Sequence, residues 1–254
     1  MVKKILSILL WVVTAAGLIV LFVFAREDYL HKPLKSIQLI PSTDTGFVRK
    51  TLLHDEIQHI CSNKNIGTID MLAVHKIMDD NSWVESSASY VDLDGTLNVS
   101  YKEYEPWFRV YGKEGHSVYV TRDGVVVPIC PIYTPYVLVA SGNFDLRNDS
   151  LTYQLIDTLD SDRNLLNALH WCEAIEENDF VSQCVGQLYC NKKDQFELTV
   201  KGFGGRVIVG DTCDAADKLR RLEIFMKQRV DSHELKNMKS INLNYKKQIV
   251  CTKR

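Results

Sequence analysis

The longest apolar run in the sequence lies near its start, at residues 5–25 (ILSILLWVVTAAGLIVLFVFA). None of its 21 residues is charged, and a helix of that length extends about 30 Å, the thickness of a bilayer core. Inside hydrocarbon, every backbone N–H and C=O group must pair within the segment, so we expect the segment to be helical. The pattern therefore predicts a single transmembrane helix over residues 5–25.

The flanks of this run predict its orientation. Two lysines precede it, and short Lys-rich flanks remain in the cytoplasm, so we expect residues 1–4 to be a cytoplasmic tail and the bulk of the chain to lie across the membrane. The alternative is a cleaved signal peptide, whose apolar part normally spans about 7–15 residues before a small-residue cleavage site. Only Ala25 is small at the far end of this run, where Phe22 and Phe24 also stand. This arrangement favours an uncleaved anchor.

The next residues alternate between strand-like and helix-like patterns. Residues 26–35 (REDYLHKPLK) show no periodicity and are expected to form a linker. Strand patterns follow at 36–40, 83–91 and 96–103, and helix patterns at 51–64 and 70–80. Asp94-Gly95 suits a primed hairpin turn between the last two strands, with positive φ at both residues. This order predicts an α+β module over residues 36–105, with two helices on one face of a three-stranded sheet.

Residues 106–254 show a different pattern, with many short strand-like runs and a few helical segments. The strand-like runs are 107–111, 117–121, 125–129, 135–141, 185–191, 196–201 and 206–209. The helical patterns are carried by Leu151, Leu155 and Leu159, by Leu165, Leu169 and Cys172, and by residues 214–229. In the closing run 241–251, one parity is shared by Ile241, Leu243, Tyr245, Ile249 and Cys251, which predicts a strand with one buried face. Together these patterns predict a larger, mixed antiparallel β-sheet domain with flanking helices.

Composition and cysteine content exclude several classes of function. A net charge of −2 provides no whole-chain attraction to nucleic acid or to anionic lipid. Seven cysteines in an odd set without a C-x-x-C motif are expected to be mostly small buried hydrophobes, with a Cys184–Cys190 or a Cys172–Cys184 bridge as the alternative. His54, His59 and Cys61 lack the spacing and the second ligand pair of a metal site. We expect no metal, no cofactor and no small-molecule substrate.

One catalytic motif provides the second functional hypothesis. Residues 92–97 (DLDGTL) match the DxDGT signature of haloacid-dehalogenase-type phosphatases, in which the first Asp attacks phosphorus and Mg²⁺ neutralises the phosphate. Residues 207–212 (VIVGDT) resemble the metal-binding strand end of that family. However, the residues after Thr96 have the pattern of a half-polar antiparallel strand, whereas the nucleophile of that family follows a buried parallel strand. The positions four and five residues after Asp211 are alanines. A hairpin turn explains the same residues. A membrane-anchored, Mg²⁺-dependent phosphatase therefore remains only as the alternative function.

The order of motifs along the chain resembles the bacterial division proteins FtsQ/DivIB, in the version found in Bacteroides-like bacteria. Residues 95–106 (GTLNVSYKEYEP) resemble the exit from their POTRA module, and residues 118–128 (VYVTRDGVVVP) resemble a strand pair of their second domain. Residues 210–222 resemble a helix entry of that domain, and residues 241–245 (INLNY) resemble its closing strand. The similarity covers nearly the whole chain in the correct order.

This resemblance implies a non-enzymatic scaffold at the division septum, anchored in the cell inner membrane with its bulk in the periplasm. The partners that it implies are FtsB and FtsL, and FtsB adds a β-strand to the edge formed by the last strand of the family's second domain. Tyr245 stands where the family has a partner-contacting tyrosine. The residues expected to contact the partner are Ile241, Asn242, Leu243, Asn244, Tyr245, Lys246, Lys247, Gln248, Ile249 and Val250.

Local chemistry agrees with this implication, because an edge strand near a chain end offers N–H and C=O groups to a partner peptide. Lys246, Lys247, Lys253 and Arg254 favour an acidic partner segment. The alternative is that residues 241–251 pair within their own sheet with both edges covered. A third interpretation, a POTRA module of an outer-membrane assembly or secretion system, would call for several copies of the module, and the pattern appears once.

Overall fold

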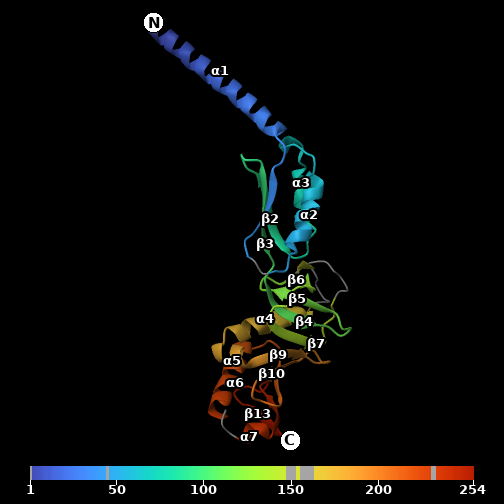
Figure 1. Cartoon of the computed structure of the whole chain (residues 1–254). Coiled ribbons are helices and arrows are strands. Elements are labelled where there is room, and N and C mark those ends of the chain that lie inside the picture. The colour runs from blue at the N-terminus through green and yellow to red at the C-terminus, as the bar shows by residue number, and fades with distance from the viewer. Residues whose placement is uncertain (1, 44–45, 147–152, 155–162, 230–232) are drawn as a thin grey trace. The chain divides into compact units, whose positions relative to one another are not determined.

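The computed structural model describes residues 2–43, 46–146, 153–154, 163–229 and 233–254 (Figure 1). The chain divides into two compact units, Met1–Glu103 and Tyr104–Arg254. The helix predicted from Leu151, Leu155 and Leu159 lies outside the described residues, except that Tyr153–Gln154 forms a short strand, β8, where that helix was expected. The α+β class with an N-terminal apolar helix and a large mixed sheet is confirmed.

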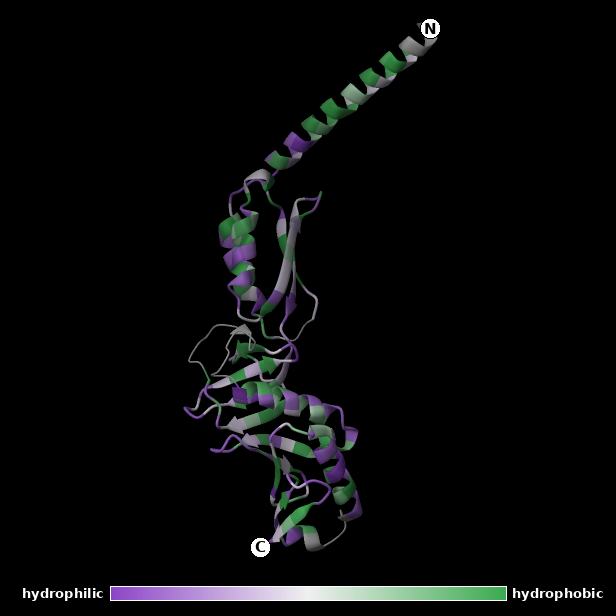
Figure 2. Ribbon diagram, turned by 180° about the vertical axis from the view of Figure 1, so that it is seen from behind, coloured by the Kyte–Doolittle hydropathy of each residue, from purple (hydrophilic) through white to green (hydrophobic). Residues whose placement is uncertain are grey.

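The first element is the helix α1 (Val2–His31), which includes the predicted membrane segment. Among the described helices, α1 alone has the length and apolar composition needed to cross a membrane. Figure 2 shows its apolar surface giving way to polar residues near its C-terminal end. The linker expected at residues 26–35 is helical as far as His31, because Tyr29 and Leu30 contact the rest of unit 1 and extend the helix until Pro33 approaches.

After α1, unit 1 continues in the predicted order of elements, and its helices α2 and α3 cover one face of the sheet (Figure 1). The elements are β1 (Ser36–Pro41), α2 (Lys50–Cys61), the short 3₁₀ helix η1 (Ile66–Thr68), α3 (Met71–Asp79), β2 (Val84–Val91) and β3 (Thr96–Glu103). The strand order is β1-β3-β2, in which β1 is parallel and β2 antiparallel to β3. Leu97, Val99 and Tyr101 on β3 are buried. So are Ile57 on α2 and Val74 and Met78 on α3.

The hairpin between β2 and β3 is present, but the prediction of a primed turn is wrong. Among its residues only Gly95 has a positive φ, of +84°. The Asp92 carboxylate accepts hydrogen bonds from the backbone N–H groups of Asp94 (3.1 Å) and Thr96 (2.9 Å). These bonds stabilise a three-residue loop that ends with a left-handed glycine, which is the next most common hairpin connection after the two-residue turn.

Unit 2 is built on a sheet with the strand order β13-β12-β11-β10-β9-β7-β4-β5-β6-β8. Its strands are β4 (Pro106–Tyr111), β5 (Ser117–Thr121), β6 (Val125–Pro128), β7 (Leu138–Gly142), β8 (Tyr153–Gln154), β9 (Val185–Cys190), β10 (Phe196–Val200), β11 (Arg206–Gly210), β12 (Met238–Asn242) and β13 (Val250–Lys253). Its helices are α4 (Arg163–Glu176), α5 (Asp179–Cys184), α6 (Ala215–Arg229) and α7 (His233–Lys236). Parallel pairs join β4 to β7, β7 to β9 and β11 to β12, and the other pairs are antiparallel.

The core of unit 2 forms where the apolar stripes of the helices meet the sheet. Trp171 from α4 and Leu219 from α6 are fully buried in one cluster with Phe108 and Leu188 from the strands. No disulfide is formed among the seven cysteines, all of which lie in described residues, so neither the Cys184–Cys190 nor the Cys172–Cys184 bridge is present. Cys61, Cys130, Cys172 and Cys190 are buried, as expected of small hydrophobes.

The closing segment differs from its prediction. Residues 241–251 do not form one strand: β12 ends at Asn242, β13 begins at Val250, and the two are antiparallel neighbours. Two local features end β12, since the Asn242 side chain accepts a hydrogen bond from the Asn244 N–H (3.0 Å) and Lys247 has a φ of +59°. Because β12 pairs with both β11 and β13, the outermost strand at this end of the sheet is β13.

We predict that Gly142→Ala destabilises unit 2 by about 3 kcal/mol, because the change combines backbone strain with overpacking. Gly142 has a φ of +115°, and an added Cβ would collide with the Cys190 carbonyl oxygen on β9. The control is Gly186→Ala on the same pair of strands, where the nearest atom to the new Cβ is the Thr199 oxygen at 3.9 Å. Hydrogen exchange of the β7 and β9 amides measures the effect, and equal exchange rates in the two variants would contradict it.

Candidate functional site

The C-terminal edge of the unit 2 sheet combines an accessible strand with a rigidly held loop. Within the described residues, no strand is hydrogen-bonded along the outer side of β13. Val250 is 40% exposed, and Thr252 and Lys253 are also exposed. On an edge strand, alternate N–H and C=O groups point outward and can pair with an added strand. Arg254 anchors the end of β13, because its backbone N–H donates to the Asn237 carbonyl and its guanidinium donates to the Gly204 carbonyl, both at 2.9 Å.

The loop between β12 and β13 is held by one guanidinium group. Arg221 on α6 donates to the carbonyl oxygens of Leu243 (3.0 Å), Tyr245 (2.9 Å) and Gln248 (3.0 Å). Its Nε also donates to the carboxylate of Asp217, one helical turn earlier on α6 (2.8 Å). The Arg221 side chain is only 16% exposed, and its hydrogen bond to Leu243 is partly buried, whereas those to Tyr245, Gln248 and Asp217 lie at the surface. The loop is therefore a shaped surface rather than a loose connection.

The start of the loop is fitted against the end of β11. The Leu243 N–H donates to the Ile208 carbonyl (2.9 Å), which continues the path of β12 by one residue. The side chain of Asn244 then lies directly against Gly210, where an added Cβ would collide with it. Gly210 also has a φ of +70°, so both its backbone conformation and its neighbour require a glycine at this position.

A buried lysine connects α6 to the same region. Lys218 is 6% exposed, and its ammonium donates to the carboxylate of Asp211 (2.8 Å) and to the backbone carbonyl of the same residue (2.9 Å). The hydrogen bond from Lys218 lowers the pKa of the Asp211 carboxyl below its ordinary value. An open cavity of about 500 Å³ lies here, bordered by Asp211, Asp217, Lys218 and the loop residues Asn244, Lys246 and Lys247. The charges on its walls alternate in sign, which does not favour one class of ion.

The ten residues predicted to contact a partner fall into three groups by burial. Ile241 and Leu243 are fully buried in the core, so their side chains are not available to a partner. Asn242 and Ile249 are partly buried. The exposed members are Asn244, Tyr245, Lys246, Lys247, Gln248 and Val250. Tyr245, at 49% exposure, is the large aromatic side chain of this surface.

Sequence reasoning missed two parts of this site. The first is the outer strand itself, since Thr252 and Lys253 lie beyond the predicted contact range but belong to β13. The second is Arg221, which organises the loop from a distant helix. Its only sequence signal was its place on the polar side of the predicted helix 214–229, and that position does not specify its partners. Gly210 followed by Asp211 marked the β11–α6 connection but not the contact with Asn244.

The phosphatase motif has a structural role in this fold. Asp92 lies in the hairpin between antiparallel β2 and β3, and its carboxylate accepts hydrogen bonds from the turn's own N–H groups. The hydrogen bond from the Thr96 N–H is the main reason that the pKa of Asp92 lies below its ordinary value. Asp211 belongs to the other compact unit and pairs with Lys218. Over the described residues, no group of three His, Cys, Asp or Glu side chains is placed to hold a metal ion.

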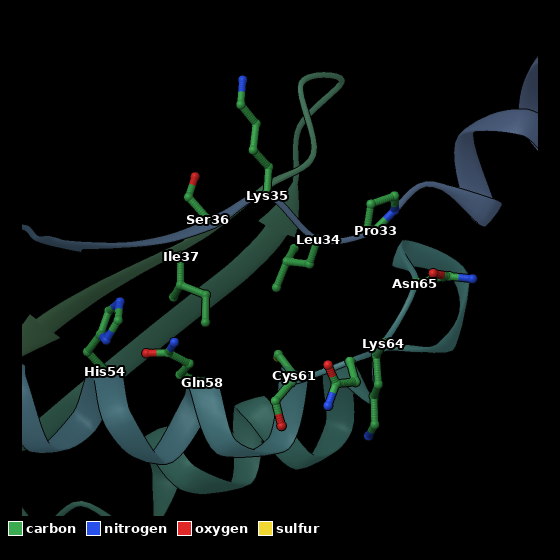
Figure 3. Close-up of a pocket in the computed structure, with 12 residues that line it drawn as sticks. Pro33, Leu34, Lys35, Ser36, Ile37, His54, Gln58, Cys61, Lys64 and Asn65 are labelled. Atoms are coloured by element: carbon green, nitrogen blue, oxygen red, sulfur yellow. The ribbon is translucent and has the colours of Figure 1, made fainter.

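A second concave surface lies in unit 1, beside the edge strand β1. Figure 3 shows this cavity of about 720 Å³, in which Leu34 and Ile37 point from the strand side toward His54 and Gln58 on α2. His54 also borders a smaller cavity of about 410 Å³ further along β1. The two cavities share His54 as a lining residue. Their walls carry side chains of mixed chemistry, with no arrangement typical of catalysis.

We predict that Arg221→Ala loosens the 243–249 loop, because three carbonyl groups lose a charged donor at a cost of about 1–3 kcal/mol. Amide exchange across residues 244–250 should become faster, while exchange in β9 and β10 should be unchanged. Arg220→Ala is the control, because Arg220 is the exposed neighbour on the same helix. Similar exchange of the loop in both variants would show that Arg221 does not hold it.

The Asp211–Lys218 pair predicts a defined pH dependence. Because the pKa of Asp211 is lowered in the folded state, its stabilising contribution is present above the ordinary Asp pKa of about 3.9 and is lost as the pH falls through the lowered value. In Lys218→Met, which keeps most of the buried stem, an NMR titration should show the Asp211 pKa returning upward. An unchanged Asp211 titration in this variant would contradict the assignment.

A comparison of the sequence with known proteins and family models finds a family match, which includes this edge. No curated protein matches the chain. The family model described as "FtsQ/DivIB, C-terminal related" matches residues 105–252, which cover more than half of the chain, nearly all of unit 2 and most of β13. The chain therefore belongs to the FtsQ/DivIB, C-terminal related family.

Proposed function

We propose that this protein is a membrane-anchored, non-enzymatic scaffold of the division septum that binds FtsB- and FtsL-like proteins by β-strand addition at β13. The observation that carries the proposal is the family match, which runs through unit 2 into its outermost strand. Membership of the FtsQ/DivIB family supports a role in cell division. The apolar helix α1 fits a single-pass membrane protein.

The placement of the chain follows from its charge pattern and its family. Residues 1–4 remain in the cytoplasm, α1 crosses the inner membrane, and residues from Arg26 onward lie in the periplasm. The β-α-α-β-β elements of unit 1 act as a POTRA module, which lies between the membrane helix and the partner-binding domain in the order of the chain. The order and pairing of these elements, with β1 parallel to β3, support that assignment.

The geometry of the C-terminal edge defines how a partner strand would bind. The partner's main chain pairs with the outward N–H and C=O groups of β13. The proposed docking strand is therefore β13, and not the range 241–250 expected from the sequence. The loop held by Arg221 presents Tyr245 beside the start of that strand, where an aromatic side chain can anchor a partner side chain. The loop therefore supplies side-chain selectivity, while the strand supplies main-chain hydrogen bonds.

Charge complementarity indicates the chemistry of the partner segment. Lys246 and Lys247 on the loop and Lys253 on β13 are exposed on the proposed surface. Positive charge on an edge strand also disfavours pairing between two copies of the chain. The partner strand is therefore acidic, and its association with this edge slows as salt concentration rises.

We predict that Tyr245→Asp strongly reduces capture of FtsB- and FtsL-like proteins from membranes by the tagged full-length chain. The variant removes an exposed aromatic contact and places a negative charge opposite an acidic partner, and it should leave the fold intact because Tyr245 is 49% exposed. Tyr136→Asp is the matched control, since Tyr136 is 97% exposed and lies on a different loop. Quantitative mass spectrometry of the captured proteins measures the effect. Capture that is unchanged in Tyr245→Asp, or reduced equally in both variants, would contradict this binding site.

A further inference from the structure

Several segments of unit 1 converge on the C-terminal end of α1. The Tyr29 hydroxyl donates to the backbone carbonyls of Val91 (3.3 Å) and Asp92 (2.9 Å), which fixes the β2–β3 hairpin turn to the helix. On η1, Gly67 packs so closely against Leu30 that an added Cβ would lie 3.0 Å from the Leu30 Cβ. The hairpin turn and η1 are therefore both attached to the last two turns of α1.

The segment after α1 strengthens this attachment. The backbone N–H of Lys35 donates to the Gly95 carbonyl at 2.8 Å, and the Ile66 N–H donates to the Lys32 carbonyl at 2.9 Å. Figure 3 shows Pro33, Leu34 and Asn65 close together beside the end of α1. The hairpin turn, η1 and residues 32–35 thus form one rigid end of unit 1, which we call the helix-proximal end.

Two leucines at this end are unusually exposed. Leu93, in the hairpin turn, is 89% exposed, and Leu72, in the first turn of α3, is 82% exposed. Among the described residues of unit 1 beyond α1, no other large apolar side chain is exposed to that degree; Tyr90 follows at 56% and Leu52 at 51%. Leu72 comes four residues after the end of η1, so it belongs to the same end of the unit. Removing either side chain from water would be favourable, because each exposes most of its apolar surface.

The length of α1 indicates what covers them. The helix continues past the apolar run, and Tyr29 lies four residues beyond Ala25, which is about 6 Å along a helix. The headgroup layer on each side of a bilayer is about 5–8 Å thick. A helix that leaves the hydrocarbon near Ala25 therefore holds Tyr29, and the hairpin turn hydrogen-bonded to it, at the level of the headgroups. Figure 1 shows the tip of the β2–β3 hairpin beside the end of α1.

We propose that Leu93 and Leu72 insert into the interface of the bilayer that α1 crosses, and so form a second membrane contact of unit 1. This inference rests on the proposed membrane anchor, but not on which side of the membrane unit 1 occupies. In this arrangement, the two leucine side chains lie at the boundary between headgroups and acyl chains, where the apolar side chains of surface-bound elements reside. The contact fixes the rotation of unit 1 about the axis of α1.

The charges at this end identify the kind of lipid surface. Asp92 and Asp94 flank Leu93, and Asp70 precedes Leu72, while Lys35 and Lys64 lie on the adjoining segments. Because these charges are of mixed sign, anionic lipid offers no net attraction. Burial of the apolar side chains drives the contact, so it forms on a zwitterionic membrane and depends little on salt.

Photo-crosslinking in lipid nanodiscs tests this contact in the full-length chain. A benzophenone amino acid replaces Leu93 or Leu72, the protein is reconstituted in phosphatidylcholine nanodiscs, and lipid adducts are counted by mass spectrometry. The control position is Leu52, which is exposed but lies nine residues before the end of α2, about 14 Å farther along the helix. We expect lipid adducts several-fold more often at positions 93 and 72 than at position 52, in low and in high salt.

The same probe at Val13, in the middle of α1, separates the two proposals. Adducts at position 13 without an excess at positions 93 and 72 over position 52 would overturn the second contact and leave the anchor in place. The absence of adducts at position 13 would overturn the anchor and, with it, the inference. A further variant, Leu72→Asp with the probe at position 93, should lose most of the adducts at position 93, because both side chains insert together; full retention would contradict joint insertion.

Discussion

The hydrogen bonds from Arg221 to the carbonyl groups of Leu243, Tyr245 and Gln248 determine where the large sheet ends. Residues 244–248 are exposed and contribute little to the core, so the reversal after β12 depends on these bonds together with the Asn242–Asn244 hydrogen bond and the positive φ of Lys247. With them, the chain reverses and places β13 outside β12. A charged side chain on a helix thus helps to order the loop that lies beside the accessible strand β13.

Arg221 is in turn positioned by the packing of α6. Leu219, Leu222 and Met226 on this helix are buried against the sheet, and Lys218 is fixed near its start by Asp211. The apolar core therefore fixes the position of α6, and α6 fixes the position of the Arg221 guanidinium group. The hydrogen bonds from that group then hold the loop in its conformation. The candidate site depends on long-range packing as well as on the local features of the loop at Asn242 and Lys247.

This dependence explains which parts of the molecule could be predicted from the sequence. Short-range patterns were enough to predict α1, which contains a long run of uncharged apolar residues. They were also enough to predict β3, where Leu97, Val99 and Tyr101 alternate with polar residues. The same kind of pattern was misleading at residues 241–251, because Ile249 and Cys251 keep the parity of Ile241 although a loop separates them. Nothing in those letters encodes the contact with Arg221, which lies 22 residues before Leu243.

The hairpin at Asp92 illustrates a related limit. The letters DLDGTL fit both a phosphatase nucleophile and a turn, and the choice depends on whether the strands on either side are parallel or antiparallel. In this fold they are antiparallel, and the Asp92 carboxylate is used to bond the N–H groups of the turn. The extension of α1 to His31 was likewise invisible to periodicity, because the contacts of Tyr29 and Leu30 with the hairpin and with η1 stabilise it.

The two units thus have separate proposed roles. Unit 1 anchors the protein in the membrane, and the C-terminal edge of unit 2 binds a partner strand. Hydrogen exchange of the full-length chain, with and without its captured FtsB-like partner, tests the central claim most directly. The account predicts that the amides of Val250–Lys253 become strongly protected on binding, while those of the other sheet edge in unit 1, at β2, do not change. Protection that is absent from β13, or that appears only on another strand, would contradict strand addition at this edge.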